Sequence, residues 1–300
     1  MDLQVARVLS VGDDLVADAA RASFNRQAAR YTTDENSRLI NFLASADPAH
    51  WTPFGHVRIS LVFGKKAMVE VLLRFPELMA GLELSSGENG LVITHSIWGW
   101  KNMLDAGVFD DRTREGIKDQ LSRIPLLDAT REALGMPSGN WMEGTEAKYS
   151  TDDITLRITC PIVIARQLFK HTVGFVYSEA SGRYIDYDGF HLPAVWCARP
   201  ANRKQGAGQP VGLVRSCMAT CLTYMAYSIS RMVYDFLQHG LGIATEQARF
   251  CMPLATSTTF VVTGSKDAWR RVIKHRMHPD AQQEIQILAG MIYNTLEKDL

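Results

Sequence analysis

The sequence is poor in the features that mark a nucleic-acid-binding or membrane-bound protein. Lys and Arg together number 32, as do Asp and Glu, so the formal net charge is zero. Without an excess of positive charge there is no global field to hold a polyanion such as DNA or an anionic membrane surface. We therefore expect neither nucleic acid nor a membrane as a partner, and any anionic ligand must be met by local positive charge.

Long hydrophobic runs are also missing. No apolar run approaches the ~18 residues that a membrane span requires. The N-terminus, MDLQVARVLSVGDD, has no positively charged region followed by a long apolar stretch, as a secretory signal would have. The expected location is the cytoplasm.

Cysteine is scarce and unpaired. Five cysteines are an odd number, they lack C-x-x-C spacing, and most stand within apolar runs, so we expect them to be reduced and largely buried. The chain also has no H-x-x-x-H pattern on an expected helix, and we expect no metal site. The cysteines are Cys160, Cys197, Cys217, Cys221 and Cys251.

The chain has no internal repeat or low-complexity segment, and 300 residues with 46% hydrophobic content suffice for a sizeable core. Period-two patterns predict strands and period-3.6 patterns predict helices along most of the chain. Residues 64–153 differ, because they are charged, contain glycine and are helical in parts, which indicates an inserted helical subdomain. The expected strands are 5–11, 56–63, 155–160 and 258–264, and the expected helices are 13–24, 33–47, 161–171, 211–240, 246–249 and a pair broken at Pro279.

The segment 211–240 has the clearest helical pattern. Its apolar residues form one continuous stripe from Val214 to Phe236, and Gly240 ends it. Such a stripe is equally consistent with a subunit interface and with an internal core helix.

Polar residues crowd the segment FKHTVGFVYSEASGRY, residues 169–184. If Pro161 begins a helix, Gln167, Lys170 and His171 share one face of it. After it comes an expected loop in which Gly182, between Ser181 and Arg183, lets the backbone approach a ligand closely. A solvated helix face explains such a pattern alone, but a loop built mainly from these residues usually binds something.

This segment resembles the signature of the flavin-dependent thymidylate synthases, which runs Arg-His-Arg, then Ser, Asn-Glu, Ser and Arg-Tyr. Other blocks resemble the family in the family's own order, and only the region 64–153 is not covered. These blocks are AARASF, HWTPFGH, RPANRKQGAG, ARFCMPLATSTTF and HRMHPDAQQEI.

The resemblance implies a single α+β domain over residues 1–300, with a mixed or antiparallel sheet flanked by long helices and with 64–153 inserted. It implies a homotetramer whose active sites lie between subunits. The implied reaction moves a one-carbon unit from methylenetetrahydrofolate to C5 of dUMP, with reduced FAD as hydride donor and NADPH as reductant. The partners would be a pyrimidine deoxynucleoside monophosphate and folate.

The resemblance also implies roles for individual residues. Arg276, which would meet the pyrimidine ring, Ser181 and His50 fall on catalytic positions. Substrate-contacting positions are Gln167, Lys170, Glu179, Ser181, Gly182, Arg183, Arg249 and Arg276. Cofactor-contacting positions are Ser23, Thr52, Lys170, His171, Thr172, Glu179, Tyr184, Ser265 and Lys274. Without the family, Arg249 and Arg276 read equally well as helix-surface ion pairs, and His50 as a loop histidine.

A cysteine nucleophile, as in the classical thymidylate synthases, is not expected. None of the five cysteines has that enzyme's Pro-Cys-His setting, and Cys160 precedes its proline. Hydride chemistry on flavin fits better.

The departures from the family pattern fall mainly on the flavin side. Three interpretations stay open: a flavin held differently, with contacts from Trp98 and Trp100; a changed outcome, such as hydroxymethylation or a cytosine nucleotide, as would suit a virus that modifies its DNA bases; or a nucleotide-binding protein that has lost flavin. The departures are Lys170 and Thr172 for two arginines, Ser178 for Asn, Ser265 and Lys274 for two asparagines, Asp280 for His, Gly55 for Glu, and one extra residue between His171 and Glu179.

Overall fold

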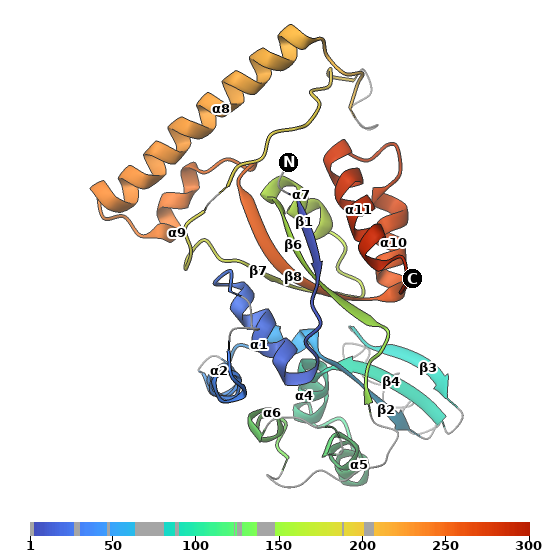
Figure 1. Cartoon of the computed structure of the whole chain (residues 1–300). Coiled ribbons are helices and arrows are strands. Elements are labelled where there is room, and N and C mark those ends of the chain that lie inside the picture. The colour runs from blue at the N-terminus through green and yellow to red at the C-terminus, as the bar shows by residue number, and fades with distance from the viewer. Residues whose placement is uncertain are drawn as a thin grey trace.

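The computed structural model describes residues 3–26, 31–46, 49–63, 81–87, 90–122, 124, 128–136, 148–187, 189–200 and 207–300. Within these residues the chain forms two four-stranded sheets, each with its own hydrophobic core, and helices that flank them (Figure 1). All strand pairs within the two sheets are antiparallel. The expected α+β class with antiparallel sheet is confirmed.

The first sheet has the strand order β1-β6-β8-β7. Its strands are β1 (Gln4–Arg7), β6 (Asp153–Pro161), β8 (Ser257–Ser265) and β7 (Phe175–Glu179). The central pair, β6 and β8, runs side by side over nine residues, from Asp153 opposite Ser265 to Pro161 opposite Ser257. Since side chains alternate across a strand, Ile158 points to one face of this sheet and Arg157 to the other.

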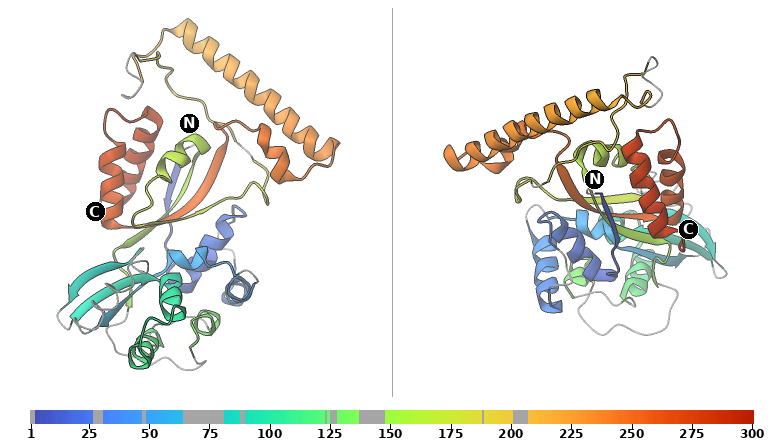
Figure 2. Two further views of the ribbon diagram at one scale, coloured as in Figure 1. Left: turned by 180° about the vertical axis from the view of Figure 1, so that it is seen from behind. Right: turned by 45° about the horizontal axis from the view of Figure 1, so that its top comes forward.

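Three helices cover the apolar face of the first sheet (Figures 1 and 2). They are α7 (Ile162–Leu168), α10 (Lys266–Arg276) and α11 (Gln283–Leu296). Helix α10 begins where the Ser265 hydroxyl accepts a hydrogen bond from the Ala268 amide at 3.3 Å, an N-cap that follows β8 without a connecting loop. Trp269 and Leu288 are fully buried in the same hydrophobic core as Phe260.

The opposite face of the first sheet carries hydroxyl and charged side chains. Thr159 and Thr259 hydrogen-bond to one another at 2.8 Å, and Thr155 and Thr263 do so at 2.7 Å. This hydroxyl face is partly covered by α1 (Gly12–Ala22) and by the short helix η2 (Thr52–His56).

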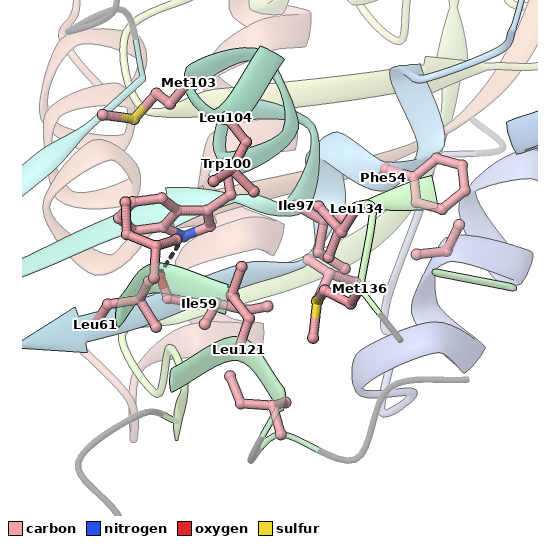
Figure 3. Packing of buried hydrophobic residues seen from close by; sticks show 14 of the residues in the cluster. Phe54, Ile59, Leu61, Ile97, Trp100, Met103, Leu104, Leu121, Leu134 and Met136 are labelled. Carbon is pink, nitrogen blue, oxygen red and sulfur yellow. Dashed lines mark hydrogen bonds between the residues drawn. The ribbon is translucent and has the colours of Figure 1, made fainter. Parts of the chain in front are cut away.

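The second sheet has the order β3-β4-β2-β5 and lies beside α1 and α2 (Thr33–Ser45), with α4 (Ile97–Asp105), α5 (Asp111–Ser122) and α6 (Asp128–Ala133) completing its core. Figure 3 shows this core, in which the indole nitrogen of Trp100 donates to the Ile59 carbonyl at 3.1 Å. The strands are β2 (Arg58–Phe63), β3 (Glu83–Gly87), β4 (Gly90–Ser96) and β5 (Lys148–Tyr149).

The sequence predicts a helical subdomain at 64–153. The described residues of this region are not purely helical. Its described residues hold three helices, but they also supply β3, β4 and β5 to the sheet built on β2. The segment Glu83–Gly87 reads ELSSG, which has little β propensity, so pairing with β4 imposes its strand conformation. Trp100 is fully buried and cannot contact a flavin, whereas Trp98 is 40% exposed. The boundaries of an insertion at 64 and 153 stay a prediction.

The helix expected at 211–240 is observed as α8 (Leu213–Asp235), followed by a π-helical turn, Phe236–Gly240. It stands away from both sheets in Figure 1, and Tyr234 is its only buried residue. The internal-core interpretation of its apolar stripe is therefore wrong for a single chain. Exposed fractions of 59% at Met218, 61% at Leu222 and 57% at Met225 leave the stripe open to a partner.

Two polar contacts join the sheets. The buried His56 ring lies 2.9 Å from the Thr263 hydroxyl and 3.0 Å from the Ser178 hydroxyl. Arg58 at the start of β2 forms a 2.8 Å ion pair with Asp153 at the start of β6, and both side chains are 8% exposed. These residues, His56, Ser178, Thr263, Arg58 and Asp153, are called the junction below.

Candidate active site

Arg276, the last residue of α10, is held by two acceptors from the region of α7. Its Nε donates to Nε2 of His171 at 2.9 Å, and one of its terminal nitrogens, Nη2, donates to the carbonyl oxygen of Gln167 at 2.9 Å. None of the hydrogen bonds among the described residues uses its other terminal nitrogen, Nη1. The guanidinium is thus oriented by the chain and keeps donor capacity for a ligand.

His171 can accept this hydrogen bond because it is neutral. Burial lowers the pKa of His171, and the positive charges of Arg276, His275 and Arg271 lower it further. The backbone position is fixed as well, since the Tyr177 hydroxyl donates to the His171 carbonyl at 2.8 Å. Helix α7 ends at Leu168, so Lys170 and His171 lie beyond it and do not share a helix face with Gln167, contrary to the sequence prediction.

A cavity of about 430 Å³ adjoins Arg276. Its lining is rich in nitrogen bases, with Lys274, His275 and His278 beside Arg276, and Asp280 as its carboxylate. Lys170 and Thr172, both exposed, flank His171 in the chain. The C-terminal ends of α7 and α10 thus form a basic surface, called the Arg276 group below.

A second group follows β7. The segment expected to be a loop is a strand through Glu179, whose carboxylate accepts a hydrogen bond from the Thr258 hydroxyl at 2.7 Å. Burial raises the pKa of Glu179, while this hydrogen bond and the charges of Arg166 and Arg249 lower it. A strand was missed here because Ser178 and Glu179 give its end no apolar alternation.

After β7 the chain turns at residues 181–184. The Ser181 amide donates to the Ser23 carbonyl at 2.9 Å, which brings the end of α1 to this turn. Gly182 packs closely there, because a Cβ atom would lie 2.5 Å from the Tyr187 ring and the ring would have to move. Its role is therefore close packing against Tyr187.

Arg183 and Tyr184 complete the second group. The Nε of Arg183 pairs with a carboxylate oxygen of Glu246 at 2.9 Å, and both side chains are about half exposed. The Tyr184 ring stacks on Phe24, with 4.9 Å between centroids. Arg249 donates to the Glu246 carbonyl, so the helical turns α9 (Thr245–Ala248) and η5 (Arg249–Cys251) bring both residues to this second, Arg183 group.

The remaining predicted residues lie apart from both groups. His50 and Thr52 are exposed at the start of η2, on the side of the second sheet. Ser265 is buried as the N-cap of α10, where its hydroxyl accepts a hydrogen bond from the Ala268 amide, and its predicted role in holding flavin stays a prediction. The block RPANRKQGAG falls largely outside the described residues, at 201–206.

A match to a protein-family model covers residues 146–300, more than half of the chain, and its description is "Thymidylate synthase complementing protein". The chain belongs to this family. Relatives over most or part of the chain carry the name flavin-dependent thymidylate synthase, which confirms both the resemblance and the prediction of a methyltransferase enzyme.

Among these relatives, the flavin-dependent thymidylate synthase of Aquifex aeolicus is 25% identical over 303 residues, covering 93% of this chain and 92% of its own length. That of Thermosipho melanesiensis is 34% identical over 133 residues, 44% of this chain and 57% of the relative. A probable flavin-dependent thymidylate synthase of Mycobacterium phage D29 is 28% identical over 52% of this chain and 64% of its own. A UMP/dUMP methylase from Streptomyces cacaoi, solved with 5-Br dUMP, has a TM-score of 0.46 at 17% identity, covering 99% of this chain and 91% of that one.

For a member of the thymidylate synthase complementing family, the sequence left several contacts unnamed. Phe24, Arg166, Glu246 and Thr258 all lie in or beside the Arg183 group. Arg166 stands next to Gln167 within the signature itself, and Phe24 ends the block AARASF, so their positions in family-like segments were an available signal. Thr258 likewise lies within the block ARFCMPLATSTTF, whereas Glu246 carried no such signal, because only the fold brings it to Arg183.

The cysteines of this family member are mostly accessible, contrary to the sequence prediction. Only Cys160 is buried, while Cys217 and Cys221 are exposed on α8. Burial, with the nearby Glu179, raises the pKa of the Cys160 thiol to about 12. Among the described residues no group of three or more His, Cys, Asp or Glu side chains is placed to hold a metal ion, and no helix is long and apolar enough to span a membrane.

Proposed function

We propose that the protein transfers a one-carbon unit from methylenetetrahydrofolate to C5 of dUMP, with reduced FAD as the hydride donor and NADPH as the reductant. The observation that carries the proposal is the guanidinium of Arg276, oriented by neutral His171 and the Gln167 carbonyl with donor capacity left over. Membership in the thymidylate synthase complementing family supports it.

Arg276 would act on the pyrimidine ring. Negative charge builds on a ring oxygen as C5 becomes nucleophilic, and a donor already aimed at that oxygen stabilises the transition state without reorganisation. Because His171 has a lowered pKa, it offers a lone pair to Arg276 and adds no positive charge that would compete for the ligand. His171 is thus a positioning residue, and Arg276 the catalytic one.

The Arg183 group would hold the nucleotide phosphate. Arg183 and Arg249 are guanidinium donors that match a phosphate dianion, and Ser181 adds a hydroxyl. In the single chain, the Glu246 carboxylate forms an ion pair with Arg183. A phosphate would replace that carboxylate, which is feasible because exposed ion pairs contribute little to stability.

The Arg276 group has a donor set that suits the negatively charged pyrophosphate of FAD. Lys170, Lys274 and the His275 ring lie on the basic surface beside its cavity. When bound, reduced FAD supplies the hydride that completes the transferred group. Gly55, in contrast, is buried with Val176 3.1 Å from a Cβ position, so no side chain reaches a flavin from there.

No thiol takes part in the proposed reaction. Cys160 lies close enough to Glu179 for that carboxylate to raise its pKa, and the raised pKa keeps the thiol protonated and unreactive at pH 7. The ring carbon is therefore activated by charge stabilisation.

The assembly would be a homotetramer with shared sites. The Arg276 group is built from the ends of α7 and α10, the Arg183 group from residues that follow β7, and His50 and Thr52 lie near the start of η2, so the proposed site residues come from separate segments of one chain. The exposed stripe of α8 offers the surface through which a second copy could join them. Light scattering should give the mass of four chains, and Met225→Glu should lower both mass and activity. An active monomer would end this part of the proposal.

The decisive assay incubates the chain with dUMP or dCMP, methylenetetrahydrofolate, FAD and dithionite, and weighs the nucleotide product. A methyl product from dUMP supports the proposal, whereas a hydroxymethyl product or a reaction confined to dCMP replaces it. Arg276→Ala should lower kcat/KM by about 10²–10³. Arg270→Ala is the matched control on the same helix, since Arg270 pairs with Asp267 and the Leu300 carbonyl. Equal losses in both variants would show that Arg276 has no role in the site.

A further inference from the structure

A cavity of about 580 Å³ opens on the hydroxyl face of the first sheet, on the opposite side of the sheet from Ile158 and Phe260. That volume is within the range of small-molecule sites. It adjoins the Arg183 group, because Ala180 lies between Glu179 and Ser181, but none of the substrate-contacting residues named above lines it. The described residues that line this Arg157 pocket are Gln4, Asn25, Arg26, Tyr31, Arg157, Thr159, Ala180, Ile185, Asp186, Tyr187, Ser257, Thr258 and Thr259.

Arg157 places a positive charge in the middle of the sheet face. It stands on the central strand β6, and burial lowers its pKa although Asp18 raises it. The two hydrogen bonds that its guanidinium makes among the described residues go to neutral acceptors, the Asn25 side chain at 2.6 Å and the Arg26 carbonyl at 3.4 Å. A half-buried guanidinium with neutral acceptors is suited to bind an anion.

The backbone is bent to maintain this arrangement. Asn25 has φ +51°, and it is the one residue other than glycine with positive φ among those the structure describes. Asn tolerates this left-handed conformation better than most residues, and such backbone geometry concentrates at functional sites. The turn at Asn25 directs its amide to Arg157 and carries Arg26 into the pocket lining.

An aromatic pair stands at the edge of this pocket. Phe24 and Tyr184 stack with 4.9 Å between centroids and 23° between planes, yet they are 45% and 55% exposed. The guanidinium carbon of Arg26 lies 6.0 Å from the Phe24 ring centre, and that of Arg183 lies 5.7 Å from the Tyr184 ring centre. Each ring face is therefore turned toward the other ring or toward a guanidinium group, and the exposed edges of the pair remain for contact with a ligand.

The pocket thus combines hydroxyl and amide groups with the guanidinium groups of Arg157 and Arg26, and the Arg26 guanidinium also reaches the aromatic pair. Among its described lining residues the one carboxylate is Asp186, which already accepts a hydrogen bond from the Tyr234 hydroxyl at 3.3 Å. A fitting ligand has a polar arm and two separate negative charges, one for each guanidinium group. A nucleoside monophosphate gathers its charges on one phosphate and matches two guanidinium groups on different segments less well.

We propose that the Arg157 pocket receives the glutamate end of the folate cosubstrate, with the α- and γ-carboxylates at Arg157 and Arg26. This assignment rests on the proposed function for the identity of the cosubstrate. No bond is made or broken in the pocket, and its effect is on affinity for folate.

Calorimetric titration of the full chain with tetrahydrofolate and with tetrahydropteroate, which lacks the glutamate, tests the assignment. Tetrahydrofolate should bind about tenfold or more tightly, as expected for a charge-assisted hydrogen bond. Arg157→Gln should remove that preference and leave tetrahydropteroate affinity within about twofold. Arg112→Gln, at an exposed arginine of α5, should keep the preference.

A preference that survives in Arg157→Gln, or equal weakening of both ligands, overturns the assignment. Equal binding of both ligands by the wild-type chain also overturns it. So does inorganic phosphate that binds at Arg157 and abolishes the preference for tetrahydrofolate. If Arg157→Gln loses its far-ultraviolet circular dichroism, Arg26→Gln at the pocket edge takes its place, with the same expected result.

The same variants separate this assignment from the proposed function. A wild-type chain that prefers tetrahydrofolate but forms no methylated nucleotide keeps the pocket and loses the function. The opposite outcome is a wild-type chain that methylates dUMP while Arg157→Gln leaves the ratio of KM values for the methylene forms of tetrahydrofolate and tetrahydropteroate unchanged. That result supports the proposed function and contradicts the assignment of the pocket.

Discussion

The junction and the Arg276 group both place a histidine with a lowered pKa against polar partners, but they differ in access to solvent. His56 at the junction is 1% exposed and has hydroxyl partners on both ring nitrogens. His171 is only partly buried and supports an arginine that keeps a free donor beside a cavity. Polar groups whose partners all come from the chain hold the two sheets together, whereas polar groups left open toward a cavity are available for chemistry.

Removing an ion-pair partner at the junction should cause the largest loss of stability. Asp153→Ala leaves the buried Arg58 with the more exposed Glu83, at 3.1 Å, as its one carboxylate partner among the described residues, and should lower the free energy of unfolding by about 3 kcal/mol. Urea denaturation measures it. The double variant Asp153→Ala/Arg58→Met should recover part of the loss, and no recovery would mean that the pair itself is not the cause.

Stability should also depend on pH through His56. Burial lowers the pKa of His56 from 6.5 to about 3, so between these values the unfolded chain takes up a proton that the folded chain does not. The contribution of the neutral ring is complete above pH 6.5 and is lost as the pH falls. Between pH 6.5 and pH 5 it amounts to about 2 kcal/mol, from about 1.4 kcal/mol per pH unit.

The difference between variants isolates this contribution from that of other groups. His56→Gln should have a shallower dependence of unfolding free energy on pH, by close to one proton, in urea titrations at pH 5, 6 and 7.5. His278→Gln, at a histidine 62% exposed, is the control and should retain the wild-type slope. Identical slopes in both variants would remove His56 from the junction's pH response.

On the open side of the comparison, Arg183→Ala should weaken nucleotide binding about tenfold while any bound flavin stays in place. The expected loss is moderate because Arg183 is half exposed and already paired with Glu246. Equilibrium dialysis with dUMP measures it. Glu246→Gln should bind dUMP at least as well as wild type, since it frees Arg183, and weaker binding there would contradict the exchange of partners.

The smallest effect is expected at Thr172. Thr172→Arg restores the second arginine of the family signature at an exposed position beside His171, and should tighten flavin binding a few-fold, about 0.5–1 kcal/mol. Flavin fluorescence titration detects this change, with Thr151→Arg as an exposed control. An unchanged affinity at position 172 would indicate that the flavin contacts this surface in another way.

Sequence patterns predicted elements where a single local signal decides the outcome. The helix expected at 33–47 is observed as Thr33–Ser45, with Thr32 and Glu35 forming a capping box. The strands around Ile158 and Phe260 were also predicted, because their apolar residues alternate or run continuously.

The elements that were missed depend on contacts across the fold. The end of β7 is polar, and β3 reads ELSSG, so only pairing with β8 and β4 makes them strands. The stripe of α8 could not be assigned to a core or an interface, because periodicity gives a helix its apolar face but not what covers that face.

The sequence predicted which residues belong to the candidate site, but not how they contact one another. Family-like motifs named Arg276, His171 and Arg183, while their partners Gln167 through its carbonyl and Glu246 through its side chain depend on backbone geometry that no motif encodes. Ser265 shows the converse, since a motif position turned out to be a helix cap.

Adjacent side chains of strand β8 lie in different surroundings. Thr258 donates to Glu179, while Thr259 points to the hydroxyl face and pairs with Thr159. One extra residue within β8 would shift its register and exchange the surroundings of every residue that follows it. Added length in a loop between β2 and β6 leaves that alternation intact, whereas a change of length within β8 disturbs it.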